Sequence, residues 1–434
     1  MKKIDWSSLW VKEDWWACWV GFFLLILAMV GIIPGFPKIG TWTADMGKAF
    51  PSGIGTLWDT IIIFVILAVL TIIAMVFMKK EIKRFIGGFA VIFALAWLGI
   101  FISKQAALNS WGLEYVIWAL IFGLLISNTI GTPSWMKPAI LTEFYIKIGL
   151  VCMGATILFS TIIKAGGVGM AQALLVVAAV WFFAYWVCRK FGMAERFSGT
   201  MATGVSICGV SASIAAGGAV QGDPKETSYI IAWLLVGAVI MIVVMPPIAR
   251  AVGMPSNMAG AWLGGTIDNT GAVVAAGEVL GKKAALDTAA LTKMAQNILI
   301  GFAAFFLAIW STLTLEKKPG AQKPSLWEIW YRFPKFIVGF IVASLIASFF
   351  IEPVMGSKAA ASITGALNNY RTWFFALCFV CIGLETNFKE LVTVGGGKPA
   401  AAYWIGQVFN IIWTLLIVWL LWSGTFFTPP ILPD

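Results

Sequence analysis

Serine, cysteine and glycine are concentrated in one short segment, which runs from Gly204 to Ser213 and reads Gly-Val-Ser-Ile-Cys-Gly-Val-Ser-Ala-Ser. The segment lies in the middle of an uncharged stretch, Phe197 to Gly222, that is long enough to cross a hydrocarbon core roughly 30 Å thick. These residue types are poor helix formers, and irregular backbone at membrane depth occurs only where it lines a cavity or is buried in protein. Discontinuous helices of this kind form substrate sites in secondary transporters. The other interpretation is a close helix–helix contact through small residues.

The ligand that suits this segment is an anion. A helix that restarts after a break presents free N–H groups and partial positive charge at its N-terminus. Hydroxyl donors are available from Ser206, Ser211 and Ser213. Cys208 and Gly209 are small enough to let a ligand approach the backbone. We therefore take these five residues as candidate substrate-binding residues.

Two carboxylates, Asp268 and Glu385, lie near the middle of apolar stretches. A charge at mid-depth in a membrane is costly unless it is paired or hydrated, so each is a candidate site for a coupling proton or Na⁺. The alternative is a neutral carboxyl that bonds to backbone freed by a broken helix. The polar residues that follow these carboxylates are further candidates for substrate binding: Asn269 and Thr270 after Asp268, and Thr386 and Asn387 after Glu385.

A second polar group lies in another predicted span. Lys293 is followed three and four residues later by Gln296 and Asn297, which places the three on one helical face. Either this face is directed toward the site, or Lys293 extends its ammonium to the membrane surface. Asn128 and Thr129 are also possible site residues, because a similar Asn-Thr pair follows Asp268.

Several enzyme classes are excluded by residues that the sequence lacks. The chain has no histidine, so it has no Ser-His catalysis, no HExxH zinc site and no histidine-ligated haem. It has no Walker A motif. Cys378 and Cys381 have the spacing of a redox or metal pair, but the surrounding phenylalanine-rich span indicates packing residues. We expect no enzymatic activity, no metal and no cofactor.

Composition places the chain in a membrane. Of its 434 residues 60% are hydrophobic and 12% charged, whereas soluble domains carry about 25% charged residues. The net charge of +10 is carried by lysine and arginine beside the apolar stretches, without the basic, aromatic-rich surface that binds nucleic acid. The sequence therefore predicts an all-α polytopic membrane protein with the lipid bilayer, and no nucleic acid, as its partner.

Hydrophobic windows predict about 13 transmembrane helices. They lie near residues 15–33, 58–78, 85–103, 114–131, 140–163, 166–188, 197–220, 229–248, 257–280, 288–313, 336–351, 372–394 and 401–422. The first three form an N-terminal extension over residues 1–113, and residues 423–434 form a short C-terminal tail.

The charges between spans predict the orientation of the chain. Basic residues follow the second, sixth, eighth and tenth spans: Lys79, Lys80, Lys83 and Arg84; Arg189, Lys190 and Arg196; Arg250; and Lys317, Lys318, Lys323, Arg332 and Lys335. By the positive-inside rule the N-terminus is cytoplasmic and the C-terminus periplasmic or extracellular. Glu143 and Lys147, four residues apart, are expected to form an ion pair near the cytoplasmic end of a span.

The ten later spans divide into two groups of five, over residues 114–251 and 257–422. Cys208 and Gly209 lie in the fourth span of the first group, and the segment Cys381-Ile-Gly-Leu-Glu-Thr-Asn387 lies in the fourth span of the second. An odd number of crossings in each repeat makes the second repeat inverted, which is typical of alternating-access transporters. We therefore predict two inverted five-helix repeats, each with a discontinuous helix at these positions.

Three motifs, in this order, resemble the sulfate exporter family of YeiH-type bacterial membrane proteins: Ser206-Ile-Cys-Gly-Val-Ser-Ala-Ser213; Gly264-Gly-Thr-Ile-Asp-Asn-Thr-Gly-Ala-Val-Val-Ala-Ala-Gly277; and Cys381-Ile-Gly-Leu-Glu-Thr-Asn-Phe388 with Gly397-Lys-Pro399. The resemblance covers residues 114–422 and implies a relationship to the superfamily of sodium/proton antiporters and bile-acid symporters. It implies a panel domain and a core domain with two crossing discontinuous helices. It also implies a homodimer in the bacterial inner membrane and an elevator-like movement of the core.

These features predict a secondary active transporter of a small anion, such as sulfate, an organic sulfonate or a carboxylate, coupled to H⁺ or Na⁺. On this interpretation the substrate lies between the 206–213 segment and the residues that follow Asp268 and Glu385. A cation/proton antiporter is the alternative within transport, because Asp268 and Asn269 resemble the acidic pairs of such proteins. A passive channel or a membrane scaffold is the alternative of another class, although a channel would spread its polar residues along whole helices.

Overall fold

The structure is a computed structural model that describes residues 7–110, 114–316, 325–388, 397–426, 428–430 and 432. Within these residues the chain is helical, apart from its loops and an isolated bridge between Trp42 and Gln105. The predicted basic positions Lys317, Lys318 and Lys323, the end of the predicted 372–394 span and part of the predicted tail lie outside the described residues.

Seven helices of the described chain are long and apolar enough to cross a membrane: Ile54–Phe77, Phe85–Ser103, Phe159–Lys190, Pro224–Ala251, Lys283–Thr314, Lys335–Met355 and Lys398–Trp422. The prediction of a multi-pass helical membrane protein is therefore confirmed. The count of 13 spans, the inverted repeats and the orientation stay predictions. Some predicted spans form shorter helices of 10 to 13 residues. At 1.5 Å per residue, such a helix is about 15–20 Å long, less than the bilayer core.

The chain divides into two compact units, Met1–Ser160 with Lys335–Glu385, and Thr161–Pro334 with Thr386–Asp434. This division groups residues that contact one another. The predicted boundaries at 113, 251 and 257 separate internal repeats, which a division by contact does not test, so the repeats stay a prediction. The first unit contains these helices in chain order: α1 (Ser8–Val11), α2 (Glu13–Met29), η1 (Met46–Ala49), α3 (Ile54–Phe77), α4 (Phe85–Ser103), α5 (Ala106–Ser110), α6 (Tyr115–Thr129), η2 (Lys137–Ala139), α7 (Thr142–Gly154), α16 (Lys335–Ile346), η4 (Ala347–Met355) and α17 (Ser357–Glu385).

An ion cluster around the buried Lys147 in the first unit joins the start of α2 to α7 and to Lys80, which follows α3. The predicted pair of Lys147 and Glu143 is present at 3.5 Å, and Lys147 also lies 2.9 Å from Asp14 and 3.2 Å from Glu13. Lys80 bonds to Glu13 at 2.7 Å. Burial acts to raise the pKa of Glu13, but the two ammonium groups outweigh it and hold that pKa below its ordinary value of 4.5. The cluster fixes the end of α2 against the neighbouring helices.

Helices α6 and α17 meet through two glycines. A Cβ added at Gly383 would lie 2.8 Å from the Cα of Gly123 and 2.7 Å from the backbone nitrogen of Leu124. Two hydroxyls then cap the end of α17, since Ser127 donates to the Gly383 carbonyl at 2.8 Å and Thr132 donates to the Leu384 carbonyl at 2.6 Å. Gly383 therefore serves a close helix contact through small residues.

The predicted break in the segment from Cys381 to Asn387 is described only in its first part. The segment from Cys381 to Asn387 was expected to contain a break at mid-span. In the structure α17 runs without interruption through Cys378, Cys381 and Gly383 and ends at Glu385. Thr386 and Asn387, which lie inside the predicted segment, are not helical, and the residues from 389 to 396 lie outside the described chain, so a break in this span stays a prediction.

Replacing Gly383 with alanine is expected to lower the midpoint of thermal unfolding, because the new Cβ meets backbone atoms that cannot move independently. Overpacking of this kind costs about 1–3 kcal/mol. Gly365→Ala on the same helix is the matched control, since a Cβ there has no atom within 4 Å. The measurement is thermal unfolding of both purified variants in detergent. Equal midpoints for the two variants would contradict the prediction.

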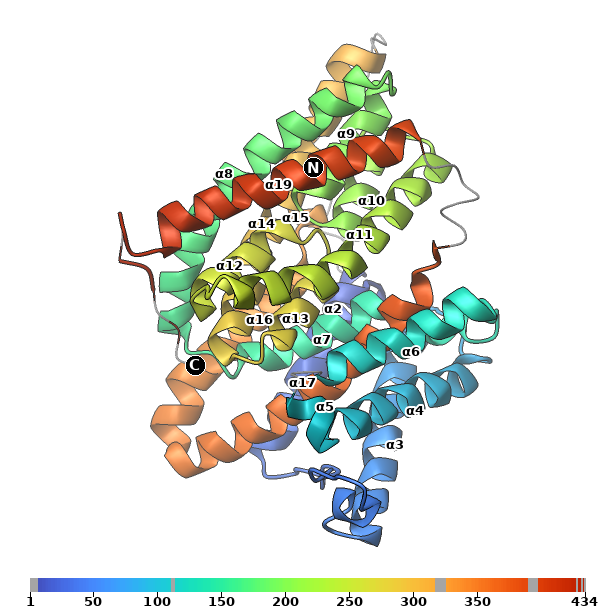
Figure 1. The fold of residues 1–434 in the computed structure, drawn as a ribbon, viewed down its shortest axis with the longest axis vertical. Helices are drawn as coiled ribbons and strands as arrows, with labels where there is room; N and C mark the ends of the chain where they lie inside the picture. The colour runs from blue at the N-terminus through green and yellow to red at the C-terminus, as the bar shows by residue number, and fades with distance from the viewer. Residues whose placement is uncertain are drawn as a thin grey trace. The chain divides into compact units, whose positions relative to one another are not determined.

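The second unit contains the remaining helices: α8 (Phe159–Lys190), α9 (Glu195–Ser206), α10 (Gly209–Ala219), α11 (Pro224–Ala251), α12 (Ser256–Thr266), α13 (Thr270–Val279), α14 (Lys283–Trp310), η3 (Ser311–Glu316), α15 (Trp327–Arg332) and α19 (Lys398–Trp422). Helix α14 packs against α10, α12 and α13. Helix α19 packs against α9 and α12, and a buried apolar cluster fills the space among α8, α9, α11 and α19 (Figure 1). The long helices of this unit thus hold four short ones.

Candidate functional site

The first pair of short helices, α9 and α10, is one span interrupted at the predicted position. Helix α9 ends at Ser206, and Ile207 departs from helical geometry with φ −121° and ψ −74°. Cys208 is extended, with φ −155° and ψ 117°, and α10 begins at Gly209. The break therefore falls inside the run of small and hydroxyl residues that the sequence analysis singled out.

The second pair, α12 and α13, is interrupted at the Asp268 motif. Helix α12 ends at Thr266, and Ile267 and Asn269 are both extended. The side-chain oxygen of Asn269 accepts a hydrogen bond from the Ala272 N–H at 3.0 Å and so caps α13. Asparagine is among the preferred N-cap residues. The second discontinuous helix of the described chain is therefore this one, and Asp268 lies in its unwound part.

The two breaks contact each other within the second unit, and we call their contact the crossing, formed by residues 207–209 and 267–270. The Gly209 N–H donates to the carbonyl of Asp268. The Cys208 sulfur lies 3.5 Å from the Thr270 hydroxyl. Gly209 favours this approach, because a Cβ there would lie 3.1 Å from the Asp268 carbonyl oxygen and 3.1 Å from the Cβ of Leu234, closer than most Cβ contacts.

The polar face of α14 is directed into the crossing. Lys293 is only 1% exposed, and its ammonium donates to the Ile207 carbonyl at 2.8 Å and to the Gln296 side-chain oxygen at 2.6 Å. Gln296 in turn donates to the Gly265 carbonyl at 2.8 Å, and Asn297 donates to the Thr270 hydroxyl at 3.0 Å. Of the two interpretations of Lys293, the structure has the inward one.

Helix α19 supplies a second polar face that the sequence analysis missed. Its members are buried and recur every three or four residues: Tyr403, Gln407, Asn410 and Thr414. Tyr403 donates to a carboxylate oxygen of Asp268 at 3.1 Å. Gln407 and Asn410 each donate to the Thr266 carbonyl at 3.0 Å. The signal was present in the sequence, because polar residues at this spacing form a stripe along one side of an otherwise apolar helix.

At the crossing, side chains bond to the backbone carbonyls at the ends of two helices but not to the backbone N–H groups at the start of α10. The broken ends of α9 and α12 expose carbonyls, and side chains from α14 and α19 cap them at Ile207, Gly265 and Thr266. The first turn of α10 receives no side-chain cap. Several buried side-chain oxygens of the region have no hydrogen-bond partner among the described residues: Asp268 Oδ1, Ser213 Oγ, Thr266 Oγ1, Asn297 Oδ1 and Gln407 Oε1. The carbonyl ends of α9 and α12 are therefore capped by side chains, whereas the N-terminus of α10 has no side-chain cap beyond the bond from the Gly209 N–H to the Asp268 carbonyl.

The other predicted residues are distributed as follows. Ser206 is buried, with its hydroxyl 3.5 Å from the Thr203 carbonyl, and Ser211 is half-buried. Asn128 and Thr129 bond to carbonyls of their own helix, α6, in the first unit. Glu385 also belongs to the first unit, is exposed, and accepts from the Thr142 hydroxyl at 2.9 Å. Thr386, which is buried, and Asn387 begin the last part of the second unit.

Comparison with known proteins places the chain among bacterial membrane proteins. A family model described as conserved hypothetical protein 698 matches residues 87–402. The chain is 42% identical to a UPF0324 membrane protein of Rhodopirellula baltica over 399 residues, which cover 91% of this chain and 73% of that protein. It is 38% identical over 407 residues to a UPF0324 membrane protein of Nitratidesulfovibrio vulgaris, and the match covers 90% of this chain and 69% of that protein. It is 28% identical over 485 residues to one of Nitrosomonas europaea, covering 97% of each.

Proposed function

Because this chain belongs to the UPF0324 family of membrane proteins, we propose that it moves a solute across the bilayer and is not an enzyme. The proposed activity is secondary active transport of a small anion, and the crossing in the second unit is the proposed binding site. Two broken helices that touch at their breaks, held by polar side chains from α14 and α19, support this proposal.

The observation that carries the choice of an anion is the unequal capping at the crossing. Lys293 provides a buried positive charge, and the first turn of α10, which has no side-chain cap, provides backbone N–H donors after that of Gly209. The Ser213 hydroxyl is buried without a partner and is a further donor. This combination suits an oxyanion such as sulfate, an organic sulfonate or a carboxylate.

We propose that Asp268 is the coupling carboxylate, with H⁺ or Na⁺ as the coupling ion. It is buried, it lies at the break, and one of its oxygens has no partner. Glu385 stays the second candidate, and it lies in the other unit. An elevator-type movement, a homodimer and an inner-membrane location are also proposed, on the family resemblance described above.

Cation/proton antiport is the second candidate function, and the position of Asp268 and Asn269 at the crossing favours it. The two functions differ in what they require of Lys293. An anion site uses its positive charge directly, whereas a cation site must tolerate it.

The proposal is tested by uptake into proteoliposomes of sulfate, methanesulfonate or succinate, driven by an inward H⁺ or Na⁺ gradient. Accumulation of at least one anion above the level of protein-free vesicles supports anion transport. Sodium or proton exchange without uptake of any of these anions would instead support the antiporter.

Asp268→Asn is expected to uncouple transport. The amide keeps the size and the acceptor oxygen for Tyr403 but cannot bind a proton and holds Na⁺ weakly, so uptake should lose its dependence on pH and on Na⁺. Gradient-driven uptake should fall by about tenfold or more, which corresponds to roughly 1.4 kcal/mol. Glu385→Gln is the comparison variant and should keep both dependences. If Glu385→Gln loses them and Asp268→Asn does not, the roles are reversed.

A further inference from the structure

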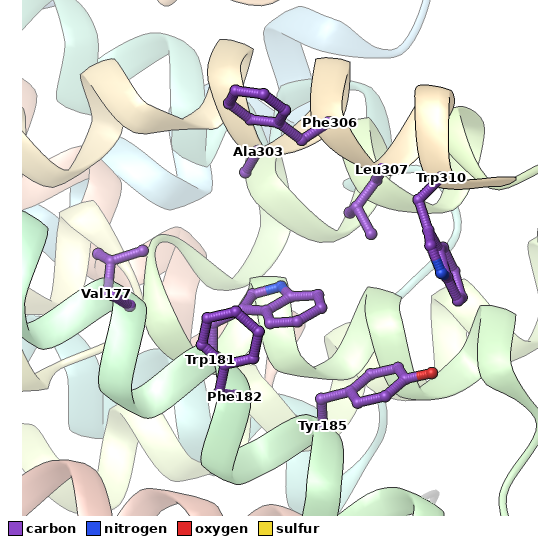
Figure 2. Close-up of a pocket in the computed structure, with 9 residues that line it drawn as sticks. Val177, Trp181, Phe182, Tyr185, Ala303, Phe306, Leu307 and Trp310 are labelled. Atoms are coloured by element: carbon purple, nitrogen blue, oxygen red, sulfur yellow. The ribbon is translucent and has the colours of Figure 1, made fainter. Parts of the chain in front are cut away.

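An apolar cavity of 540 Å³ lies between α8 and α14 in the second unit, outside the crossing. This volume is within the range of roughly 300–1,000 Å³ that is typical of sites for small ligands. Figure 2 shows its aromatic wall, in which Trp181 and Tyr185 of α8 and Trp310 of α14 contribute rings. Trp181 and Tyr185 stack at 5.2 Å, and Trp310 meets Tyr185 edge-on at 6.2 Å.

The lining excludes a charged or strongly polar ligand. All nine lining residues are aliphatic or aromatic, and none carries a charge. Their only polar side-chain atoms are two indole nitrogens and one phenol oxygen. The Trp181 indole already donates to the Thr203 hydroxyl at 2.9 Å. An anion that binds at the crossing would find no counter-charge here, so the cavity takes a ligand of a different class.

The two helices that form the cavity indicate where its ligand comes from. Both α8 and α14 are among the helices able to span the bilayer. Phe182 of α8 is 69% exposed and Phe306 of α14 is 64% exposed, so the cavity is flanked by aromatic side chains on the outer surface of the unit. On a membrane-spanning helix such a surface faces hydrocarbon. We propose that the cavity binds an acyl chain of a bilayer phospholipid.

The bound chain would contact the packing around the first break. Trp181 donates a hydrogen bond to Thr203 of α9, and Leu307 packs in the cluster that contains Ala216 of α10 and Val220, the residue that follows that helix. At the other side of the cavity, Val177 and Ala303 pack against the apolar cluster that contains Ile207, Cys208 and Ala212. The lipid chain therefore fills space behind both half-helices and stabilises their broken arrangement.

The test uses the full chain in vesicles of phosphatidylethanolamine and phosphatidylglycerol that contain a phosphatidylcholine with a photoreactive diazirine in its acyl chain. After illumination, adducts are located by peptide mass spectrometry. We expect several-fold more adducts on residues 177–185 and 303–310 than on the exposed face of α3 at Val65, Val69 and Ile73. Equal labelling of the two regions would overturn the proposal.

A cavity-filling variant separates a specific site from general lipid contact. Ala178→Trp places a ring where the acyl chain would lie and should reduce adducts on α8 and α14 several-fold, with α3 labelling unchanged. Val243→Trp on the exposed face of α11 is the matched control and should label like the wild type. Should Ala178→Trp not fold, Ala178→Leu provides the smaller filling side chain. Unchanged labelling of α8 and α14 in a folded filling variant would overturn the proposal.

Thermal stability gives a second readout that needs no transport assay. Adding phosphatidylglycerol to the detergent-purified protein should raise the unfolding midpoint of the wild type and of Val243→Trp, because a ligand that binds the folded state stabilises it. The rise should be absent in Ala178→Trp. An equal rise in all three proteins would show that the cavity is not the site. The result is independent of whether the crossing transports an anion.

Discussion

Lys293→Gln is expected to lower anion uptake by about 100-fold, or roughly 2.7 kcal/mol, while the protein remains folded. Glutamine keeps an N–H donor for the Ile207 carbonyl, so the broken end of α9 retains a cap. The substitution removes the buried positive charge that the proposed anion contacts. Uptake of sulfate, methanesulfonate and succinate into proteoliposomes measures the loss. Lys164→Gln is the matched control, because Lys164 is an exposed residue on α8 of the same unit, and its uptake should equal that of the wild type.

A second variant separates loss of binding from loss of folding. Asp268 interacts electrostatically with Lys293, and removal of one partner leaves the other charge uncompensated in a buried place. The double variant Lys293→Gln, Asp268→Asn removes both charges and should restore any stability that the single variant loses. Anion uptake should stay as low as in Lys293→Gln. Uptake that recovers together with stability would mean that Lys293 only supports the fold.

Gly209→Val is expected to abolish uptake and leave a protein that elutes as a single folded species. The new side chain would meet the Asp268 carbonyl and Leu234 at the point where the two breaks touch, so it would force them apart by a small distance. Because a displacement of about 1 Å at a binding site can cost 100-fold in activity, the effect on uptake should exceed the effect on stability.

The control for this variant lies on the same short helix. A Cβ at Gly218 of α10 has no atom within 4 Å, so Gly218→Val tests only the cost of a β-branched residue in that helix. We expect Gly218→Val to keep at least half of wild-type uptake. Equal loss in both variants would indicate that α10 fails as a helix and that the contact at Gly209 has no special role.

The class of the protein and the first break could be predicted from the sequence, for physical reasons that act locally. Burial of this much apolar surface needs a membrane, and composition alone shows it. A run of glycine, serine and cysteine weakens a helix whatever surrounds it, and α9 accordingly ends at Ser206. The inward direction of Lys293 needed the structure, because a lysine within a span can reach either the interior or the surface.

The break at Asp268 was not one of the two breaks that the sequence predicted, because a glycine near an acidic residue has two physical meanings. At Gly383 the glycine lets α6 and α17 approach, and the helix continues to Glu385. At Asp268 the break comes from Asn269, whose side chain bonds to the Ala272 N–H and thereby starts a new helix. The local signal was Asn269, an N-cap residue that is followed by Thr-Gly and marks the point where the helix starts again. Whether Gly383 contacts another helix depends on residues more than 250 positions away, as the Ser127 bond to Gly383 illustrates.

The polar stripe of α19 has a consequence for how the protein is made. Gln407 and Asn410 cap the carbonyl of Thr266, and Asn410 is 144 residues further along the chain. During synthesis the end of α12 is therefore made long before the caps from α19 exist, and the stripe of α19 finds these partners only if α12 is already in place. Uncapped carbonyls and buried amides are both costly in hydrocarbon. We therefore expect the docking of α19 and the closure of the crossing to be one event, because an unassembled α19 would expose its amides to hydrocarbon.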